Sequence, residues 1–302
     1  MKSFKNPLIL PSEKHNTSDP FIAYYNEYYY HIYNGVDGIY ISKFKEFRDI
    51  ENGEIMNVYP VENGKGVEWY APELHRIGDS WYIYVSPDYG DDLHCMTVLR
   101  LESETPMGLF ENMGVIKGLE GEWTIDGTVF EFDDKLWFIW TFGSELYLQE
   151  MSSPDALNAT AKRILLTKAE LPFETITDIK VNEGPAVLKK GNKIHVIYSA
   201  NDSHFDTYCL GRITFNGGDI LDINNWEKCR ESVFKMSDSV FGPGHCSFTT
   251  AQNGDSFDDY IVFHANIESG SDWEGRCVFV QKFEWDENDN PVFGVPKTGD
   301  VL

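Results

Sequence analysis

One short β-type pattern recurs five times along this chain, and this repeat limits the possible fold more than any other feature. The copies are YNEYYYHIY, GDSWYIYVS, DDKLWFIWT, GNKIHVIYS and FDDYIVFHA, which align at Tyr28, Trp81, Leu136, Ile194 and Tyr260. Each copy is a polar turn followed by aromatic and β-branched residues, as is typical of a strand. Another β-like run follows each copy. Five units of at least three strands each predict an all-β fold, a five-bladed β-propeller.

The composition agrees with one large β-rich core. Of the 302 residues, 42% are hydrophobic and 15% aromatic, and few segments have helical periodicity. The repeat runs from about Asp19 to about Phe283 without a Ser/Gly-rich or Pro-rich linker between units. We therefore expect residues 1–302 to form a single domain.

A polar residue in a Pro or Gly context precedes each copy of the repeat. These residues are Asp19, Glu73, Asp126, Glu183 and His245. In the fourth unit, Gly184 and Pro185 fix a bend directly after Glu183, and two strand-like segments flank a turn at 191–192. Because the five polar residues occupy similar places in their units, we expect them to converge at one end of the central channel.

Three of these residues are carboxylic acids, and their convergence would create a site for proton chemistry. If Asp19, Asp126 and Glu183 share a confined site, mutual repulsion raises the pKa of at least one of them. Each motif alone has a simpler explanation, since Asp-Pro begins many turns and Asp-Gly many hairpins. Glu73 could equally pair with Arg76. The repeat register is what favours a functional interpretation.

The charge and the termini exclude several classes of protein. A net charge of -24, from 49 acidic and 25 basic residues, argues against binding to nucleic acid or to an anionic membrane and favours a neutral partner. The apolar run near the amino terminus is too short for a signal peptide, and no stretch approaches a membrane span. We expect a cytoplasmic protein, or a secreted one if a leader was removed. The five cysteines lack C-x-x-C spacing, so neither a disulfide framework nor a zinc site is indicated.

The motifs DPF, YAPELH, IDGTVF, NEGPAVL and GPGHCSF, in this order, resemble glycoside hydrolase family 43 over nearly the whole chain. The resemblance implies a five-bladed β-propeller that hydrolyses glycosides with inversion at the anomeric carbon. It further implies that Asp19 is the general base, Glu183 the general acid, and Asp126 the residue that tunes and orients the acid. An inverting glycosidase needs one protonated and one ionised carboxyl group on opposite faces of the sugar.

The resemblance also implies contacts to the substrate and an ion. The implied substrate-binding residues are Phe21, Tyr70, Glu73, Trp123, His245 and Arg276. His245 could also belong to a structural Ca²⁺ site in the central channel, through water, although Ca²⁺ prefers oxygen ligands; the chemistry requires no cofactor. Simpler alternatives remain, since Trp69 or Tyr70 could be core residues and Arg276 could form a surface ion pair.

Within the family, the segments YCLGRITF, GPGH and FEWDENDNPVFGVP look most like the exo-acting α-L-arabinofuranosidases, which implies a small neutral arabino-oligosaccharide as substrate. β-Xylosidases and endo-arabinanases share the three acids and stay open as alternatives. A non-catalytic glycan-binding propeller is the alternative from another class. Its mark would be the loss of an acid, and all three acids are present.

Overall fold

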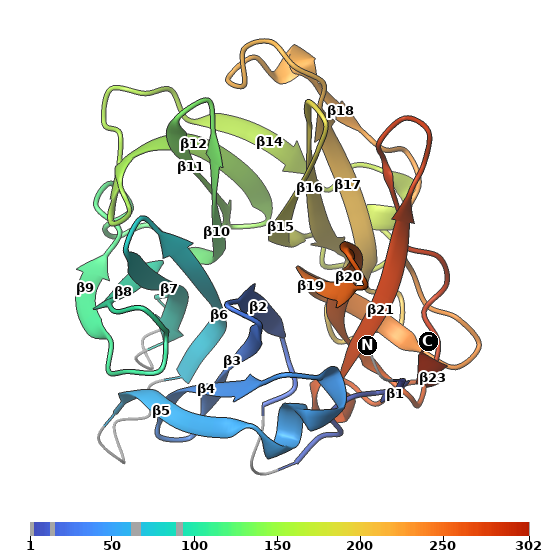
Figure 1. The fold of residues 1–302 in the computed structure, drawn as a ribbon. Helices are drawn as coiled ribbons and strands as arrows, with labels where there is room; N and C mark the ends of the chain where they lie inside the picture. The colour runs from blue at the N-terminus through green and yellow to red at the C-terminus, as the bar shows by residue number, and fades with distance from the viewer. Residues whose placement is uncertain (1–2, 13–15, 62–67, 89–92, 302) are drawn as a thin grey trace.

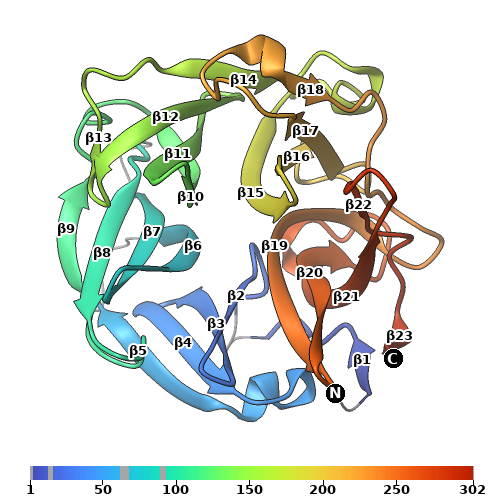
Figure 2. The ribbon, with the colours of Figure 1, turned by 45° about the horizontal axis from the view of Figure 1, so that its top comes forward.

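Each repeat of the sequence forms one blade of a ring in the computed structural model, which describes residues 3–12, 16–61, 68–88 and 93–301 (Figure 1). These residues form five antiparallel sheets around a common axis, which confirms the predicted five-bladed β-propeller (Figure 2). Four of these sheets have four strands and the sheet of the third blade has five, which agrees with the prediction of at least three strands in each unit. Among the described residues, no helix is long and apolar enough to cross a membrane.

The strands of the five blades follow one another along the chain. Blade 1 consists of β2 (Phe21–Tyr25), β3 (Tyr28–Gly35), β4 (Gly38–Phe44) and β5 (Glu54–Pro60), and blade 2 of β6 (Glu68–Ile77), β7 (Ser80–Asp88), β8 (Thr97–Glu102) and β9 (Glu111–Val115). Blade 3 consists of β10 (Thr124–Phe132), β11 (Lys135–Phe142), β12 (Glu145–Ser153), β13 (Ala156–Leu157) and β14 (Ile164–Lys168). Blade 4 consists of β15 (Asn182–Lys190), β16 (Lys193–Ala200), β17 (Cys209–Phe215) and β18 (Trp226–Lys228), and blade 5 of β19 (Phe241–Asn253), β20 (Ser256–Asn266), β21 (Cys277–Trp285) and β22 (Pro291–Val292). The helices in the described ranges are short 3-10 turns: η1 (Phe47–Asn52), η2 (Pro172–Glu174), η3 (Ile223–Asn225) and η4 (Trp273–Gly275).

The second strand of each blade is apolar along most of its length because neighbouring blades cover both of its faces. In β7 and β16 nearly every residue is buried. Strands with one solvent-exposed face would instead alternate between apolar and polar residues. The aromatic runs that define the repeat are therefore the strands in the middle of the packed layers.

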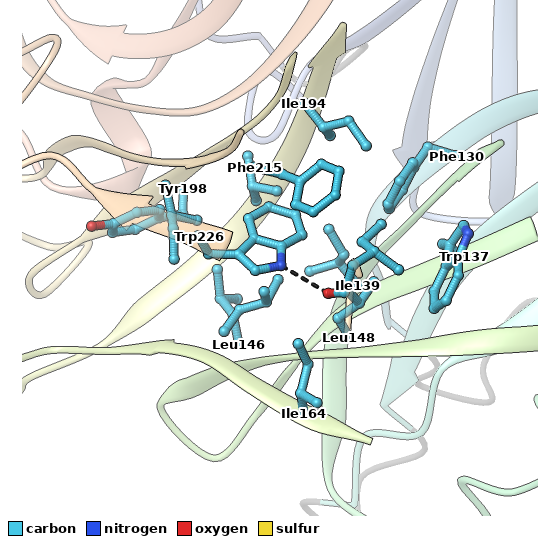
Figure 3. Packing of buried hydrophobic residues seen from close by; sticks show 14 of the residues in the cluster. Phe130, Trp137, Ile139, Leu146, Leu148, Ile164, Ile194, Tyr198, Phe215 and Trp226 are labelled. Carbon is cyan, nitrogen blue, oxygen red and sulfur yellow. Dashed lines mark hydrogen bonds between the residues drawn. The ribbon is translucent and has the colours of Figure 1, made fainter. Parts of the chain in front are cut away.

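The packing between blades 3 and 4 illustrates this core (Figure 3). Trp137 and Ile139 of blade 3 lie in one buried cluster with Tyr198 and Trp226 of blade 4. The indole N–H of Trp226 is satisfied by the backbone oxygen of Ile220 at 2.9 Å. Burial of each large apolar side chain contributes about 1.5–3 kcal/mol, so such clusters fix each blade against the next.

The two ends of the chain close the ring together. Strand β1 (Phe4–Asn6) pairs with β23 (Gly299–Val301), and the side-chain amide of Asn6 donates to the backbone oxygen of Val280 and accepts from its N–H. The backbone N–H of Leu8 donates to Val278, also in β21. This arrangement was not predicted, because β1 and β23 have three residues each and lie outside the repeat.

The innermost strands share a kink close to where each begins. A positive φ occurs at Asp19 just before β2, and at Ala71, Asp126, Gly184 and His245 in β6, β10, β15 and β19. At the last four positions the register with the second strand also shifts, as in a β-bulge. Bulges bend a strand and redirect its side chains, and a left-handed non-glycine residue costs about 1–3 kcal/mol. The five blades are thus bent at one common level of the ring.

Candidate active site

Asp19 lies at this level, surrounded by nitrogen atoms. Its Oδ1 is 3.2 Å from Nδ1 of His245 and 3.6 Å from Nη1 of Arg276, and its backbone N–H donates to Nδ1 of His264 at 3.1 Å. Burial raises the pKa of Asp19, but His245, His264 and Arg276 outweigh burial and hold the pKa well below its ordinary value. Asp19 is therefore ionised throughout the neutral and mildly acidic range.

The pKa values of Asp126 and Glu183 are raised, in contrast to the lowered pKa of Asp19. Oδ2 of Asp126 accepts a 3.0 Å hydrogen bond from the backbone N–H of Gly184, the residue after Glu183. Burial, assisted by the charges of Glu183 and Asp19, raises the pKa of Asp126 to about 7, although His245 and the Gly184 N–H act against this rise. Burial also raises the pKa of Glu183, with Asp19 assisting and Tyr208, His245 and Arg276 opposing. The two acids thus hold protons more readily than free carboxyl groups do.

His245 supplies positive charge to the three acids. Burial alone would lower its pKa, but Asp19, Asp126, Glu183 and Glu73 raise it above its ordinary value. Its backbone N–H donates to Oγ of Ser199 at 2.7 Å. A Cβ at Gly184 would lie 3.1 Å from the His245 ring, and Gly184 has a φ of +55°, so the bend after Glu183 requires glycine.

Glu73 lies near this cluster, since its charge helps to raise the pKa of His245. It is buried, and its Oε2 lies 2.7 Å from Nε2 of His75. The alternative pairing with Arg76 is wrong, because the Arg76 guanidinium lies over the Tyr25 ring at 4.3 Å. Phe21 reaches the same place, since its ring centroid is 5.2 Å from that of His75.

Tyr70 and Trp123 are linked through a third ring. The His94 ring lies 5.2 Å from Tyr70 and 5.5 Å from Trp123. Tyr70 and Trp123 are only partly buried, so the alternative that Tyr70 is a core residue does not hold. Trp69 is 2% exposed and does belong to the core. The Tyr70 hydroxyl donates to Glu68. Burial and Glu68 raise the pKa of Tyr70, and the charge of Asp19 adds to this effect.

Arg276 is buried, with 7% of its surface exposed, which removes the alternative of a surface ion pair. Besides facing Asp19, it donates to Oγ of Ser18 and to the backbone oxygen of Ser203, each at 3.2 Å. The structure therefore fixes this cation beside Asp19.

Sequence reasoning missed two residues of the cluster. The hydroxyl of Tyr208 donates to Oε1 of Glu183 at 2.7 Å, and its ring stacks on His264. A signal for His264 was available, because this histidine stands where the other four copies of the repeat have Ile32, Val85, Trp140 and Tyr198. Tyr208 opens the segment YCLGRITF, but that segment indicated only a likeness to the arabinofuranosidases and did not mark Tyr208 as a site residue.

The side chains around His245 do not fit a directly bound metal ion. Within the part of the chain that the structure describes, no group of three or more His, Cys, Asp or Glu side chains is arranged to hold one. Nδ1 of His245 faces Asp19, and a protonated imidazole repels a cation. A Ca²⁺ ion held through water stays a prediction.

Comparisons with known proteins agree with these motifs. The family model described as "Glycosyl hydrolases family 43" matches residues 4–291. An extracellular exo-α-(1→5)-L-arabinofuranosidase of Streptomyces avermitilis is 29% identical and aligns with 97% of this chain and 64% of its own length. A protein of the same name from Streptomyces chartreusis is 34% identical, over 65% of this chain and 62% of its own length. A crystal structure of an α-L-arabinofuranosidase from Lactobacillus brevis superimposes with a TM-score of 0.86 at 28% identity, covering 97% of each chain.

Two consequences follow from these likenesses. This chain spans less than two thirds of the length of either Streptomyces relative. The expected cytoplasmic location is contradicted, because both relatives are named extracellular proteins. That expectation depended on the short apolar run near the amino terminus, which is weak support for a location.

Proposed function

This chain belongs to glycoside hydrolase family 43, and from that membership we propose that it is an inverting, exo-acting α-L-arabinofuranosidase that uses Asp19, Asp126 and Glu183 as catalytic residues. The names of the Streptomyces and Lactobacillus relatives support the sugar, and the cluster of buried acids supports the reaction. An extracellular location, as in the names of the Streptomyces relatives, is part of the same proposal.

The observation that carries the proposal is that the pKa values of the three carboxyl groups are shifted in opposite directions. Asp19 has a lowered pKa and is ionised, whereas the pKa values of Asp126 and Glu183 are raised. Neighbouring acids whose pKa values are driven apart mark the acid and base of a proton-transfer site. A propeller that only binds glycans would need no such separation.

In the proposed reaction, Asp19 takes a proton from a water molecule that attacks the anomeric carbon. Glu183 donates its proton to the oxygen of the departing sugar on the opposite side, and the configuration inverts. Asp126 holds the peptide that follows Glu183 through the Gly184 N–H and stabilises the protonated acid by its proximity. His245 and Arg276 keep Asp19 ionised.

We propose short, neutral arabino-oligosaccharides as substrates. The net charge of -24 disfavours acidic glycans, which the protein would repel. Tyr70 and Trp123, joined by His94, offer partly exposed rings on which a sugar can pack. Phe21, Glu73, His245 and Arg276 remain the other proposed contacts.

Release of p-nitrophenol from the α-L-arabinofuranoside and the β-D-xyloside tests this function. We expect the arabinofuranoside to be the better substrate, and NMR of the first product to show inverted configuration. Preference for the xyloside would make the protein a β-xylosidase, and cleavage only within arabinan chains would make it an endo-arabinanase. Absence of hydrolysis with retained glycan binding would indicate the non-catalytic propeller.

A further inference from the structure

Tyr208 lies beside Glu183, immediately before β17. Its side chain is 1% exposed, and its hydroxyl donates to Oε1 of Glu183 at 2.7 Å. Burial, together with the charge of Glu183, holds the pKa of this phenol well above its ordinary value. The hydroxyl therefore keeps its proton and remains a donor at every pH at which a glycosidase works.

The Tyr208 ring is held in one position by two contacts. A Cβ on Gly244 would lie 2.0 Å from Cε1 of Tyr208, so the ring occupies the space that a side chain at Gly244 would need. The ring is also nearly parallel to the imidazole of His264, at 5.8 Å and 6°. His264 in turn accepts from the backbone N–H of Asp19. One stacked pair thus connects the surroundings of Glu183 and Asp19.

We propose that Tyr208 is a positioning residue that fixes the orientation of Glu183 and directs its proton to Oε2. This inference rests on the proposed role of Glu183 as the general acid. In a protonated carboxyl group only one oxygen carries hydrogen. Because Oε1 already accepts from Tyr208, a proton on Oε1 would compete with that hydrogen bond, whereas a proton on Oε2 is free to reach the sugar.

The same hydrogen bond also affects how readily Glu183 ionises. A donor binds an ionised carboxylate more strongly than a neutral carboxyl group. Tyr208 therefore opposes burial, which raises the pKa of Glu183. Without the hydroxyl, the pKa should rise further, and the acid should also lose its orientation.

Tyr208→Phe removes only the hydroxyl and leaves the ring in place. We expect the alkaline limb of the kcat/KM profile to move up by about one pH unit. Cleavage of arabinobiose, whose leaving group needs the proton, should fall roughly 10- to 100-fold, within the range that general acid catalysis contributes. An activated aryl arabinofuranoside should lose much less. A purely structural role would lower both rates equally and leave the limb unmoved.

Tyr198→Phe is the matched control. Tyr198 is equally buried in the same blade, and its hydroxyl also donates to a carboxylate at 2.7 Å, but the acceptor is Glu174 rather than Glu183. The control should lower the melting temperature without moving the limb. A limb shift as large in Tyr198→Phe as in Tyr208→Phe, or no shift in Tyr208→Phe, would overturn the inference.

Two further measurements separate this inference from the proposed function. Carbon-13 NMR can titrate the Glu183 carboxyl in the wild-type protein and in Tyr208→Phe without any substrate. An upward shift of the midpoint supports the role of Tyr208, and an unchanged midpoint overturns it, even if no glycoside is hydrolysed. Gly244→Ala, which displaces the ring but keeps the hydroxyl residue, should move the midpoint in the same direction.

Discussion

The backbone N–H of Gly184 donates to Oδ2 of Asp126 across the boundary between blades 3 and 4. A carboxyl group at the kink of one blade therefore holds the peptide that follows an acid in the next blade. The bond is possible because both inner strands are bent at the same level. The carboxyl group of one acid is thus tied to the backbone beside the other, although the two acids lie far apart in sequence.

Asp126→Asn should move the alkaline limb of the kcat/KM profile to lower pH. The amide oxygen can still accept from Gly184, but the variant cannot gain the negative charge that Asp126 acquires as the pH rises through its pKa of about 7, so Glu183 ionises more readily in that range. The expected direction is opposite to that for Tyr208→Phe. We expect a rate loss of about 10- to 100-fold near neutral pH, part of the contribution of a correctly tuned acid. An unmoved limb would show that Asp126 acts only by positioning.

Glu183→Gln and Asp19→Asn should differ in their dependence on the leaving group. Removal of the proton donor should slow arabinobiose cleavage by about 10²- to 10⁴-fold while sparing an activated aryl glycoside. Removal of the base should abolish both reactions, because water must be activated whatever the leaving group. Steady-state rates on the two substrates check this. Equal losses for Glu183→Gln on both would contradict its assignment as the acid.

His245→Asn should reduce the pH dependence of the stability of the fold. The pKa of His245 is raised in the folded protein, so its contribution is fully present below its ordinary value of 6.5 and is lost as pH rises through the folded value. The melting temperature of the wild-type protein should therefore fall relative to that of the variant on raising the pH through this window. Thermal unfolding of both proteins at several pH values provides the measurement. Parallel curves would show that His245 is not protonated.

Asp19 should show the reverse dependence. Its pKa is lowered on folding, so its contribution to stability is present above its ordinary value of 3.8 and disappears only as pH falls through the lower folded value. Asp19→Asn should abolish that part of the acid-induced loss of stability. Acid unfolding followed by circular dichroism, with Asp79→Asn at an exposed position as control, would check this expectation.

If a Ca²⁺ ion is bound near His245 through water, chelation should lower the melting temperature, and added Ca²⁺ should restore it. Ligand binding to the native state stabilises it in proportion to the logarithm of the free ion concentration. Metal analysis that finds no ion, together with a chelator that has no effect, would remove the prediction.

The sequence predicted the blades better than it predicted where each polar residue lies relative to the kink of its inner strand. The aromatic runs are visible because the middle strands are buried on both faces. Glu73, however, lies two residues beyond the left-handed Ala71, whereas Asp126 and His245 are themselves left-handed. A pattern of residue types does not reveal where a bulge adds a residue, so the equivalence of Glu73 with the other four was only approximate.

The remaining site residues depend on contacts that no local pattern encodes. Tyr208 is recognisable only once Gly244, from another blade, leaves space for its ring. His264 stands out as a histidine among apolar residues of the repeat, but its contact with Asp19 requires the ring to close between blades 5 and 1. The repeat does not reveal which residues of different blades come into contact when the ring closes.

Because β1 pairs with β23, the chain could in principle begin in a different blade without changing the order of the blades around the ring. Because the two ends lie in one small sheet, a short linker could join them, and the chain could be opened elsewhere. The turn at Gly191 between β15 and β16 is a candidate opening point, since it lies at the opposite end of its strands from Glu183. A circular permutant opened there should fold to the same ring and keep Asp19, Asp126, Glu183 and His245 together, although none of the four would retain its place in the linear order.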